Sequence, residues 1–148
     1  MTTNQLIPNY NVNIIPAGSF TWREYAVLKG FHELAIPTPS QYQNAMFLFT
    51  QLQKLIRTPL GKPIDIASGA RTAEYTRWLQ KCGIPAANKS AHNDWQAVDL
   101  HVPKGMSLTE FWTFCDSRWP GRMEQWQFTP TWVHLDIRNW GERIRFKP

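Results

Sequence analysis

Apolar and polar residues alternate most clearly in the second half of the chain. Within residues 97–102, Val98 and Leu100 lie on one face of an extended segment, while Asp99 and His101 lie on the other. This period of two predicts a β-strand with one buried face. Residues 132–137 alternate in the same way, and shorter strand-like runs cover residues 63–67, 123–128 and 143–146.

Helical signals dominate the first half. Apolar residues recur at helical spacing across residues 38–56, and a proline occupies the first helical position, where its missing N–H costs nothing. Thr21 and Glu24 form a capping box, in which the cap residue and the acid satisfy each other's backbone donors. The same pattern recurs at Ser107 and Glu110. We predict helices at about residues 21–30, 38–56, 72–81 and 107–119, with a break at 58–61.

The order of these elements favours an α+β fold. Helices come first and strands cluster late, which is typical of a central antiparallel sheet with helices packed on one side. The length of 148 residues suits one domain, and 43% hydrophobic with 18% charged residues is an ordinary globular composition. Residues 1–18 contain Pro8, Pro16 and Gly18, so we expect an irregular N-terminal arm there and a folded domain at residues 19–148.

Charge and cysteine content narrow the function classes. The net charge of +5 and the pI of about 9.5 favour polyanionic partners, but the arginines are scattered, which disfavours nucleic acid. Cys82 and Cys115 alone make neither a disulfide framework nor a CxxC metal site. The sequence lacks a signal-peptide pattern and any stretch of transmembrane length. We therefore expect a monomer that is made in the cytoplasm and does not insert into membranes.

The polar faces of the two alternating strands carry candidate metal ligands. Asp99 lies on that face of the first strand and His134 on that face of the second. Neighbouring antiparallel strands lie about 5 Å apart, so both side chains could reach one ion, and the loop before the first strand could bring His92 there. Catalytic zinc takes three such ligands and keeps one position open. Residues at this spacing are also ordinary structural residues in many strands, so the spacing alone leaves both interpretations open.

Four sequence blocks carry a resemblance to a known family. They are Ser90-Ala91-His92 with Asp99 seven residues on, WVHLD at residues 132–136, SGAR at residues 68–71 and an FxxxEY segment at residues 20–25. Their order and spacing across residues 19–146 resemble the M15 metallopeptidases, which include zinc D-Ala-D-Ala carboxypeptidases and phage endolysins. The H-x-D strand motif is similar to one subgroup. The resemblance implies the fold that this family shares with hedgehog signalling domains.

The resemblance also implies roles for individual residues. It implies that His92, Asp99 and His134 bind one Zn²⁺ ion. It further implies that Arg71 anchors the substrate, through a carboxylate or the carbonyl oxygen beside the cleaved bond, which suits a forked and permanently charged donor. The structural alternative for Arg71 is a surface ion pair with Glu74, three residues on.

Two positions depart from the family pattern. Trp95 stands where the family has a glycine, and its ring is expected to reshape or narrow the pocket. Thr131 stands where related enzymes place a general base. Asp136 is the substitute, either moving a proton from water to the leaving amine or orienting a metal ligand. Ser90 and Trp132, beside the ligands, are expected to contact the substrate.

Together, these features predict a zinc-dependent peptidase that cleaves peptidoglycan stem or cross-link peptides. It would act as a D-Ala-D-Ala carboxypeptidase or as an endopeptidase. The positive charge suits an anionic cell wall, and the lack of an export pattern suits a phage endolysin or virion-associated lysin that reaches the wall after release. The alternative is a catalytically inactive domain of the same fold, with a binding or virion structural role, which Thr131 and Trp95 would favour.

Overall fold

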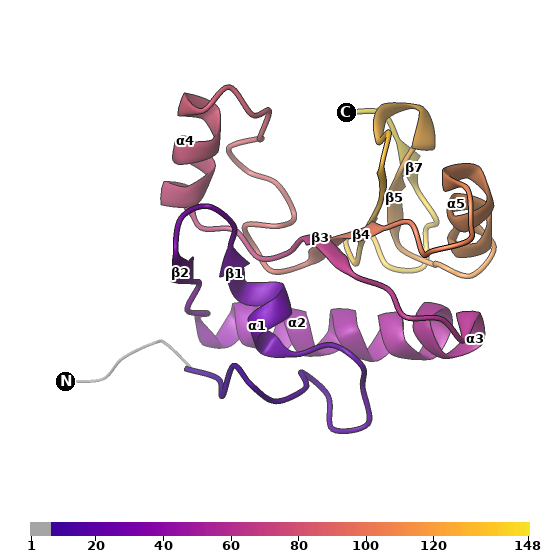
Figure 1. Cartoon of the computed structure of the whole chain (residues 1–148), viewed down its shortest axis with the longest axis horizontal. Coiled ribbons are helices and arrows are strands. Elements are labelled where there is room, and N and C mark those ends of the chain that lie inside the picture. Colours follow the sequence, from indigo (N-terminus) through magenta and orange to yellow (C-terminus); the bar gives the residue numbers. More distant parts are fainter. Residues whose placement is uncertain (1–6) are drawn as a thin grey trace.

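A five-stranded sheet forms the centre of the molecule. The computed structural model describes residues 7–148, and the strands of this sheet lie in the order β3-β4-β6-β5-β7 (Figure 1). Their bounds are Ile66–Ser68 for β3, Ala97–His101 for β4, Trp132–Asp136 for β6, Arg122–Glu124 for β5 and Arg145–Phe146 for β7. Neighbours from β3 through β5 pair antiparallel, as predicted.

The β7 edge departs from the predicted antiparallel sheet. Strand β7 runs parallel to β5, with Arg145 opposite Met123 and Phe146 opposite Glu124. The chain reverses after β6, but β7 pairs on the far side of β5 instead of beside β6, so it points the same way as β5. The α+β class is confirmed, with one parallel pair at the sheet edge.

The main helices begin where capping residues predict them. They are α1 (Trp22–Ala26), α2 (Pro39–Leu52), α4 (Ala73–Lys81) and α5 (Leu108–Asp116). Both predicted capping boxes are present, at Thr21 with Glu24 and at Ser107 with Glu110. Between residues 7 and 148, no helix is long and apolar enough to cross a bilayer.

The predicted break at residues 58–61 is corrected by the structure. Helix α2 passes through a π-helical turn, Gln53–Arg57, into a short α3, Thr58–Leu60. The N–H of Thr58 donates to the carbonyl of Gln53, so the turn is wider than an α-helical one just before Pro59. The helical path ends at Gly61, whose φ of 69° lies in the left-handed region that favours glycine.

Two short segments differ from the predicted elements. The helix expected to reach Gly30 stops early, because β1 (Val27–Leu28) and β2 (Glu33–Leu34) form a hairpin. Gly30 lies in its turn with a φ of 81°. The strand expected to reach residue 128 ends at Glu124, and Trp126–Phe128 form a 3₁₀ turn through which the chain reverses toward β6.

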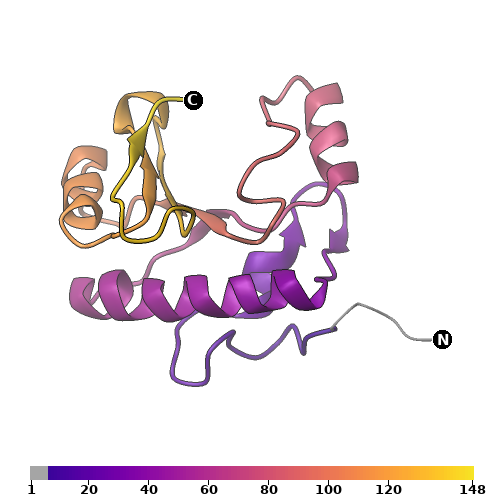
Figure 2. The same cartoon turned by 180° about the vertical axis from the view of Figure 1, so that it is seen from behind.

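Helices lie on both sides of the sheet. Helix α2 runs along one side of β3 and β4 in both views, whereas α4 rises on the other side (Figures 1 and 2). Helix α4 packs against the β1–β2 hairpin, where the ring of Phe31 lies 5.8 Å from that of Tyr75 and 5.6 Å from that of Trp78. The expected packing of helices on one side therefore does not hold for α4.

The predicted alternation divides the central strands into two faces. One face enters the hydrophobic core and carries the fully buried side chains Val98, Leu100, Met123, Val133 and Leu135. The opposite face carries the polar residues Asp99, Glu124, His134 and Asp136, which occupy the intervening positions. The sheet thus separates an apolar core from a polar surface on which a site can be built.

The described part of the expected N-terminal arm is attached to the domain. Residues 1–6 lie outside the described residues. Ile14 belongs to the core, Asn13 forms an isolated bridge with Thr21, and the hydroxyl of Tyr10 donates to the carbonyl of Ala35 at 2.9 Å. Residues 7–18 therefore pack on the structure that follows them.

A close backbone contact joins α1 to the segment after β3. The carbonyl of Tyr25 accepts from the N–H of Ala70 at 2.8 Å, and the hydroxyl of Tyr25 donates to the carbonyl of Ala97 at 2.9 Å. Gly69 precedes Ala70 in this contact, and a Cβ added to it would clash with the carbonyl oxygen of Tyr25. Only glycine allows this approach, which explains the glycine of the SGAR block.

We predict that Gly69→Ala destabilises the protein by at least about 3 kcal/mol, because the new methyl group must displace backbone atoms. The control is Gly83→Ala, whose φ of 77° also favours glycine but whose added Cβ would meet nothing within 4 Å. It should cost only about 1–2 kcal/mol. Urea unfolding of both variants measures the difference. Equal losses would contradict the close contact.

Candidate metal centre

Three predicted ligands meet on the polar face of the sheet. The register of β4 and β6 places Asp99 directly opposite His134, and the loop before β4 brings His92 to the same place. One ligand atom from each residue lies within 4.8 Å of the others. The exposed fractions of His92, Asp99 and His134 are 3%, 7% and 8%, so the group is almost closed to solvent.

His134 is held at both ring nitrogens. Its Nδ1 lies 2.8 Å from Oδ1 of Asp99, and its Nε2 lies 2.8 Å from Oδ2 of Asp136. Asp136 follows His134 by two residues on the same strand, so both side chains point to the same face. Both neighbours are acceptors, so Nε2–H donates to Asp136 and, in the protonated ring, Nδ1–H donates to Asp99, which directs Nδ1 into the three-residue group.

His92 is anchored in the corresponding way. Its Nδ1 lies 2.7 Å from the carbonyl oxygen of Gly69, and its Nε2 lies 3.3 Å from Oδ2 of Asp99. A carbonyl only accepts, so Nδ1 carries the hydrogen and Nε2 keeps its lone pair. The N–H of Arg71 donates to the carbonyl of His92 at 3.2 Å, which fixes the loop to the SGAR turn.

Burial and mutual attraction set the pKa values of the three residues. Burial lowers the pKa of His92, against the nearby Asp99 carboxylate. Burial acts to raise the pKa of Asp99, but the charges and hydrogen bonds of His92 and His134 hold it well below its usual range. Burial acts to lower the pKa of His134, but hydrogen bonds to Asp136 and Asp99 raise it to about 9. In the metal-free site, His134 is therefore a cation at neutral pH, with a hydrogen on both ring nitrogens.

The donor set fits a metal ion. Each histidine offers one nitrogen to the group and has its other nitrogen anchored, and Asp99 adds carboxylate oxygens. Two imidazoles and a carboxylate are borderline-soft ligands that suit zinc and similar divalent ions. A bound ion would take the place of the proton on Nδ1 of His134. This buried group could thus hold a metal ion.

Asp136 is enclosed by its own contacts. It is 1% exposed. Its Oδ2 meets Nε2 of His134, its Oδ1 accepts from the N–H of Arg138 at 3.0 Å, and Nε of Arg122 lies 3.9 Å from Oδ2. These contacts match the second role considered for Asp136, in which it orients His134.

Arg71 lies beside the group with part of its donor capacity unused. One of its terminal nitrogens donates to the hydroxyl of Ser68 at 3.1 Å, while its buried Nε has no hydrogen-bond partner. Its positive charge contributes to the lowered pKa of His92, so it lies close to the ligands. Within residues 7–148, no ion pair joins Arg71 to Glu74.

The other predicted substrate contacts lie near the group. The hydroxyl of Ser90 donates to Oδ1 of Asn93 at 3.1 Å, which stabilises the turn that carries His92. Trp132 begins β6 opposite His101 and is partly exposed. Their contact with a substrate stays a prediction.

Trp95 does not enter the site as expected. Its ring is 1% exposed and packs edge-on against Tyr25 in the core, with 5.7 Å between ring centroids. Its backbone has a φ of 59°, in the region that favours glycine. A glycine at this position of the family pattern would suit that backbone, and the tryptophan ring is accommodated by turning inward.

The sequence interpretation missed one acidic residue on the same face. Glu124 ends β5, which pairs with β6 beside His134, and burial raises its pKa. The signal was present, because Arg122 and Glu124 alternate with the apolar Met123. It was hidden by the neighbouring alternation of Trp126 and Phe128, which led us to place the strand too far along the chain.

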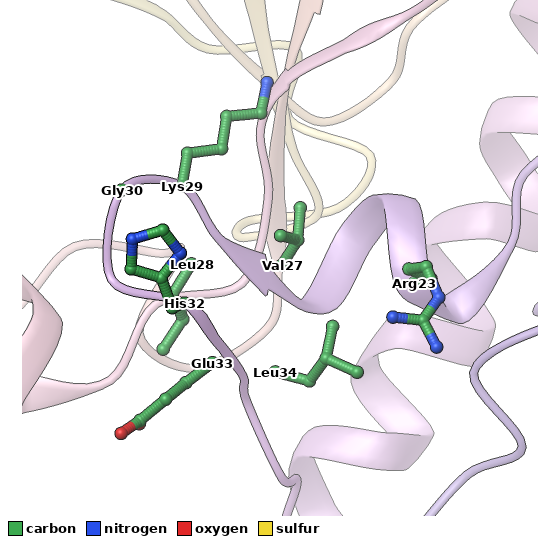
Figure 3. A pocket seen from close by; sticks show the side chains of 8 residues that line it. All are labelled: Arg23, Val27, Leu28, Lys29, Gly30, His32, Glu33 and Leu34. Carbon is green, nitrogen blue, oxygen red and sulfur yellow. The ribbon is translucent and has the colours of Figure 1, made fainter.

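A separate pocket lies beside the β1–β2 hairpin (Figure 3). It is lined by Arg23 and by residues of the hairpin. Lys29 turns away toward β3, where its ammonium group donates to the carbonyls of Ile66 and Ala67. None of the three ligand residues lines this pocket, so it is no part of the candidate metal centre.

Comparisons with protein-family models, with curated proteins and with solved structures gave no match.

We predict that the purified protein binds about one divalent metal ion per chain and that His92→Ala removes it. His101→Ala is the matched control, because His101 lies on the same face of β4 but is exposed and outside the group. Elemental mass spectrometry after dialysis against zinc measures the metal content. Equal metal content in wild type and His92→Ala would contradict the assignment.

The metal-free protein should lose stability as the pH rises from about 6.5 to about 9. The folded state keeps a proton on His134 whose pKa is raised to about 9, whereas the unfolded state has already released it. The stabilisation is complete below pH 6.5 and disappears as the pH passes through 9. Urea unfolding in chelator measures it, with His101→Ala expected to follow wild type. The trend should disappear in His134→Gln, and its persistence there would assign it to another group.

Proposed function

We propose that this protein is a zinc-dependent peptidase that cleaves the stem or cross-link peptides of peptidoglycan. The observation that carries the proposal is the buried group of His92, Asp99 and His134, in which each histidine is anchored at one nitrogen and directs the other inward. A divalent ion that displaced the proton between Nδ1 of His134 and Asp99 would find two imidazole nitrogens and a carboxylate already facing one another. Resemblance to the M15 metallopeptidases supports the choice of reaction.

Zinc is the metal that the donor set favours. Three protein ligands of nitrogen and oxygen type leave a fourth position open, as in catalytic zinc sites. Zinc held there would polarise a peptide carbonyl and lower the pKa of water. The chain's own contribution is to fix the ligands, which the carbonyl of Gly69 and the carboxylate of Asp136 do from outside the group.

Arg71 supports a peptide substrate with a carboxylate or a polarised carbonyl near the cleaved bond. Its Nε is buried and unpaired, and a buried donor without a partner is costly unless a ligand completes it. The forked guanidinium group also suits a carboxylate or a developing oxyanion. Ser90 and Trp132, each two residues before a ligand histidine, would contact the rest of the peptide.

The wall as substrate follows from charge and family resemblance. The net charge of +5 favours association with an anionic polymer. A carboxypeptidase acting on D-Ala-D-Ala ends and an endopeptidase acting on cross-links both fit the site. A phage endolysin or virion-associated lysin would place such an enzyme at the wall.

We predict that the zinc-loaded protein releases new peptide termini from purified peptidoglycan and that His92→Ala does not. Mass spectrometry of the soluble fragments identifies the cleaved bond. The inactive-domain alternative predicts the same zinc content with no fragments. If peptidoglycan stays intact after incubation with folded, zinc-loaded protein, peptidoglycan is not the substrate.

Arg71→Ala should lower kcat/KM by about 100-fold or more, because it removes donors from a water-poor site. Arg77→Ala is the matched control, since Arg77 is an exposed arginine on α4. Both variants should bind zinc like wild type. An unchanged rate for Arg71→Ala would show that the substrate is anchored elsewhere.

A further inference from the structure

We propose that Glu124 is the catalytic carboxylate that moves the proton in this site. The inference rests on the proposed hydrolysis and deepens it. It gives to Glu124 the proton-transfer role considered for Asp136, whose side chain is bonded to His134 and to the backbone of Arg138.

Strand pairing places Glu124 next to His134. Arg122 pairs with Asp136 and Met123 with Leu135 in the antiparallel register of β5 and β6. The next position in this register sets Glu124 opposite His134. Side chains at opposite positions have their Cβ atoms about 4.5–5.5 Å apart. Because Met123 faces the core, Glu124 must share the polar face with His134.

The carboxylate of Glu124 is free where that of Asp136 is engaged. Among residues 7–148, no hydrogen bond or ion pair is formed by the side chain of Glu124, and the residue is only partly buried. Asp136 is closed to solvent and bound by His134 and Arg138. A group that transfers protons must exchange them with water, which suits the partly exposed Glu124 better than the enclosed Asp136.

The backbone of Glu124 is fixed on both sides. Its carbonyl accepts from Nε1 of Trp112 at 2.9 Å, and Phe146 on β7 pairs with it. The ring of Phe146 in turn lies edge-on to that of His134, with 5.6 Å between centroids, and beneath the guanidinium group of Arg122. Strand β7 therefore holds the backbone of Glu124 beside His134, which limits the positions that the Glu124 side chain can sample.

The electrostatic environment of Glu124 agrees with its place on the sheet. Burial raises its pKa, the charge of His134 opposes that rise and the charge of Asp99 adds to it. Two of the ligand residues thus act on Glu124 through space, as its position opposite His134 requires.

The proton path follows from this position. As the oxygen of water bonds to the peptide carbonyl carbon, one proton of the water passes to the Glu124 carboxylate, and the carbonyl π electrons move to its oxygen. The oxyanion then reforms the C=O bond, and the C–N bond breaks. Glu124 gives its proton to the leaving nitrogen, so the products are a carboxylic acid and an amine, and Glu124 is again a carboxylate.

Glu124→Gln tests the inference, with Glu142→Gln as the matched control on an exposed loop. We expect kcat for a peptidoglycan-derived peptide to fall about 100- to 10,000-fold in Glu124→Gln, with Glu142→Gln like wild type. Zinc content and the thermal melting temperature should stay at wild-type values. The KM of the residual activity should be within about threefold of wild type, because glutamine keeps the shape and loses only the charge.

The outcomes separate this inference from the proposed function. If wild type cleaves the peptide and Glu124→Gln cleaves it equally well, the inference is wrong and the proposed function stands. If Glu124→Gln loses zinc, Glu124 serves the metal and the inference is again wrong. If zinc-loaded wild type cleaves nothing, the proposed function fails and takes the inference with it. A selective loss in Asp136→Asn at normal zinc content would return the role to Asp136.

Discussion

The close approach of Gly69 to the backbone of Tyr25 is the constraint on which the site depends. It brings the SGAR turn against α1, and the carbonyl of Gly69 then fixes the ring of His92. The hydroxyl of Tyr25 meanwhile bonds the start of β4 at Ala97, 2.9 Å away, two residues before Asp99. One buried tyrosine thus helps to position both ligands of the segment that carries His92 and Asp99. The segment of residues 20–25, the SGAR turn and the segment that carries His92 and Asp99 therefore meet at this one contact.

The sheet supplies the third ligand by a simpler rule. Period-two alternation puts apolar residues of β4, β5 and β6 in the core and leaves their polar neighbours facing away. Antiparallel pairing then aligns Asp99 with His134 without any loop. Because ordered strands hold two of the three ligands, the site needs little rearrangement to accept an ion, and rigid elements give more exact sites than loops do.

The sequence was sufficient where a local rule decides the outcome. Capping boxes locate α1 and α5, and alternation predicts that Asp99 and His134 lie on the polar faces of their strands. The sequence was not sufficient where contacts between distant segments decide the structure. The strands of the β1–β2 hairpin have two residues each, which is too short for a periodic pattern. The pairing of β7 with β5, and not with β6, is also invisible in the sequence of β7 alone. Glu124 was missed for a related reason, since only the register of β5 against β6 shows that it faces His134. The position of Trp95 was also not predictable locally, because its ring packs in the core against Tyr25, which is distant in the sequence.

Charge balance relates the acids of the site to the ion that it could hold. Without metal, the carboxylates of Asp99 and Asp136 face the cations of protonated His134 and Arg122. Arg71 adds a positive charge near His92, and Glu124 adds a negative charge near His134 and Asp99. A divalent ion that replaces the proton on His134 adds one net positive charge, and an unbalanced charge in a buried site is costly. Asp136 cannot offset it, because its interactions are already made, so the unpaired carboxylate of Glu124 is the nearby group with capacity left.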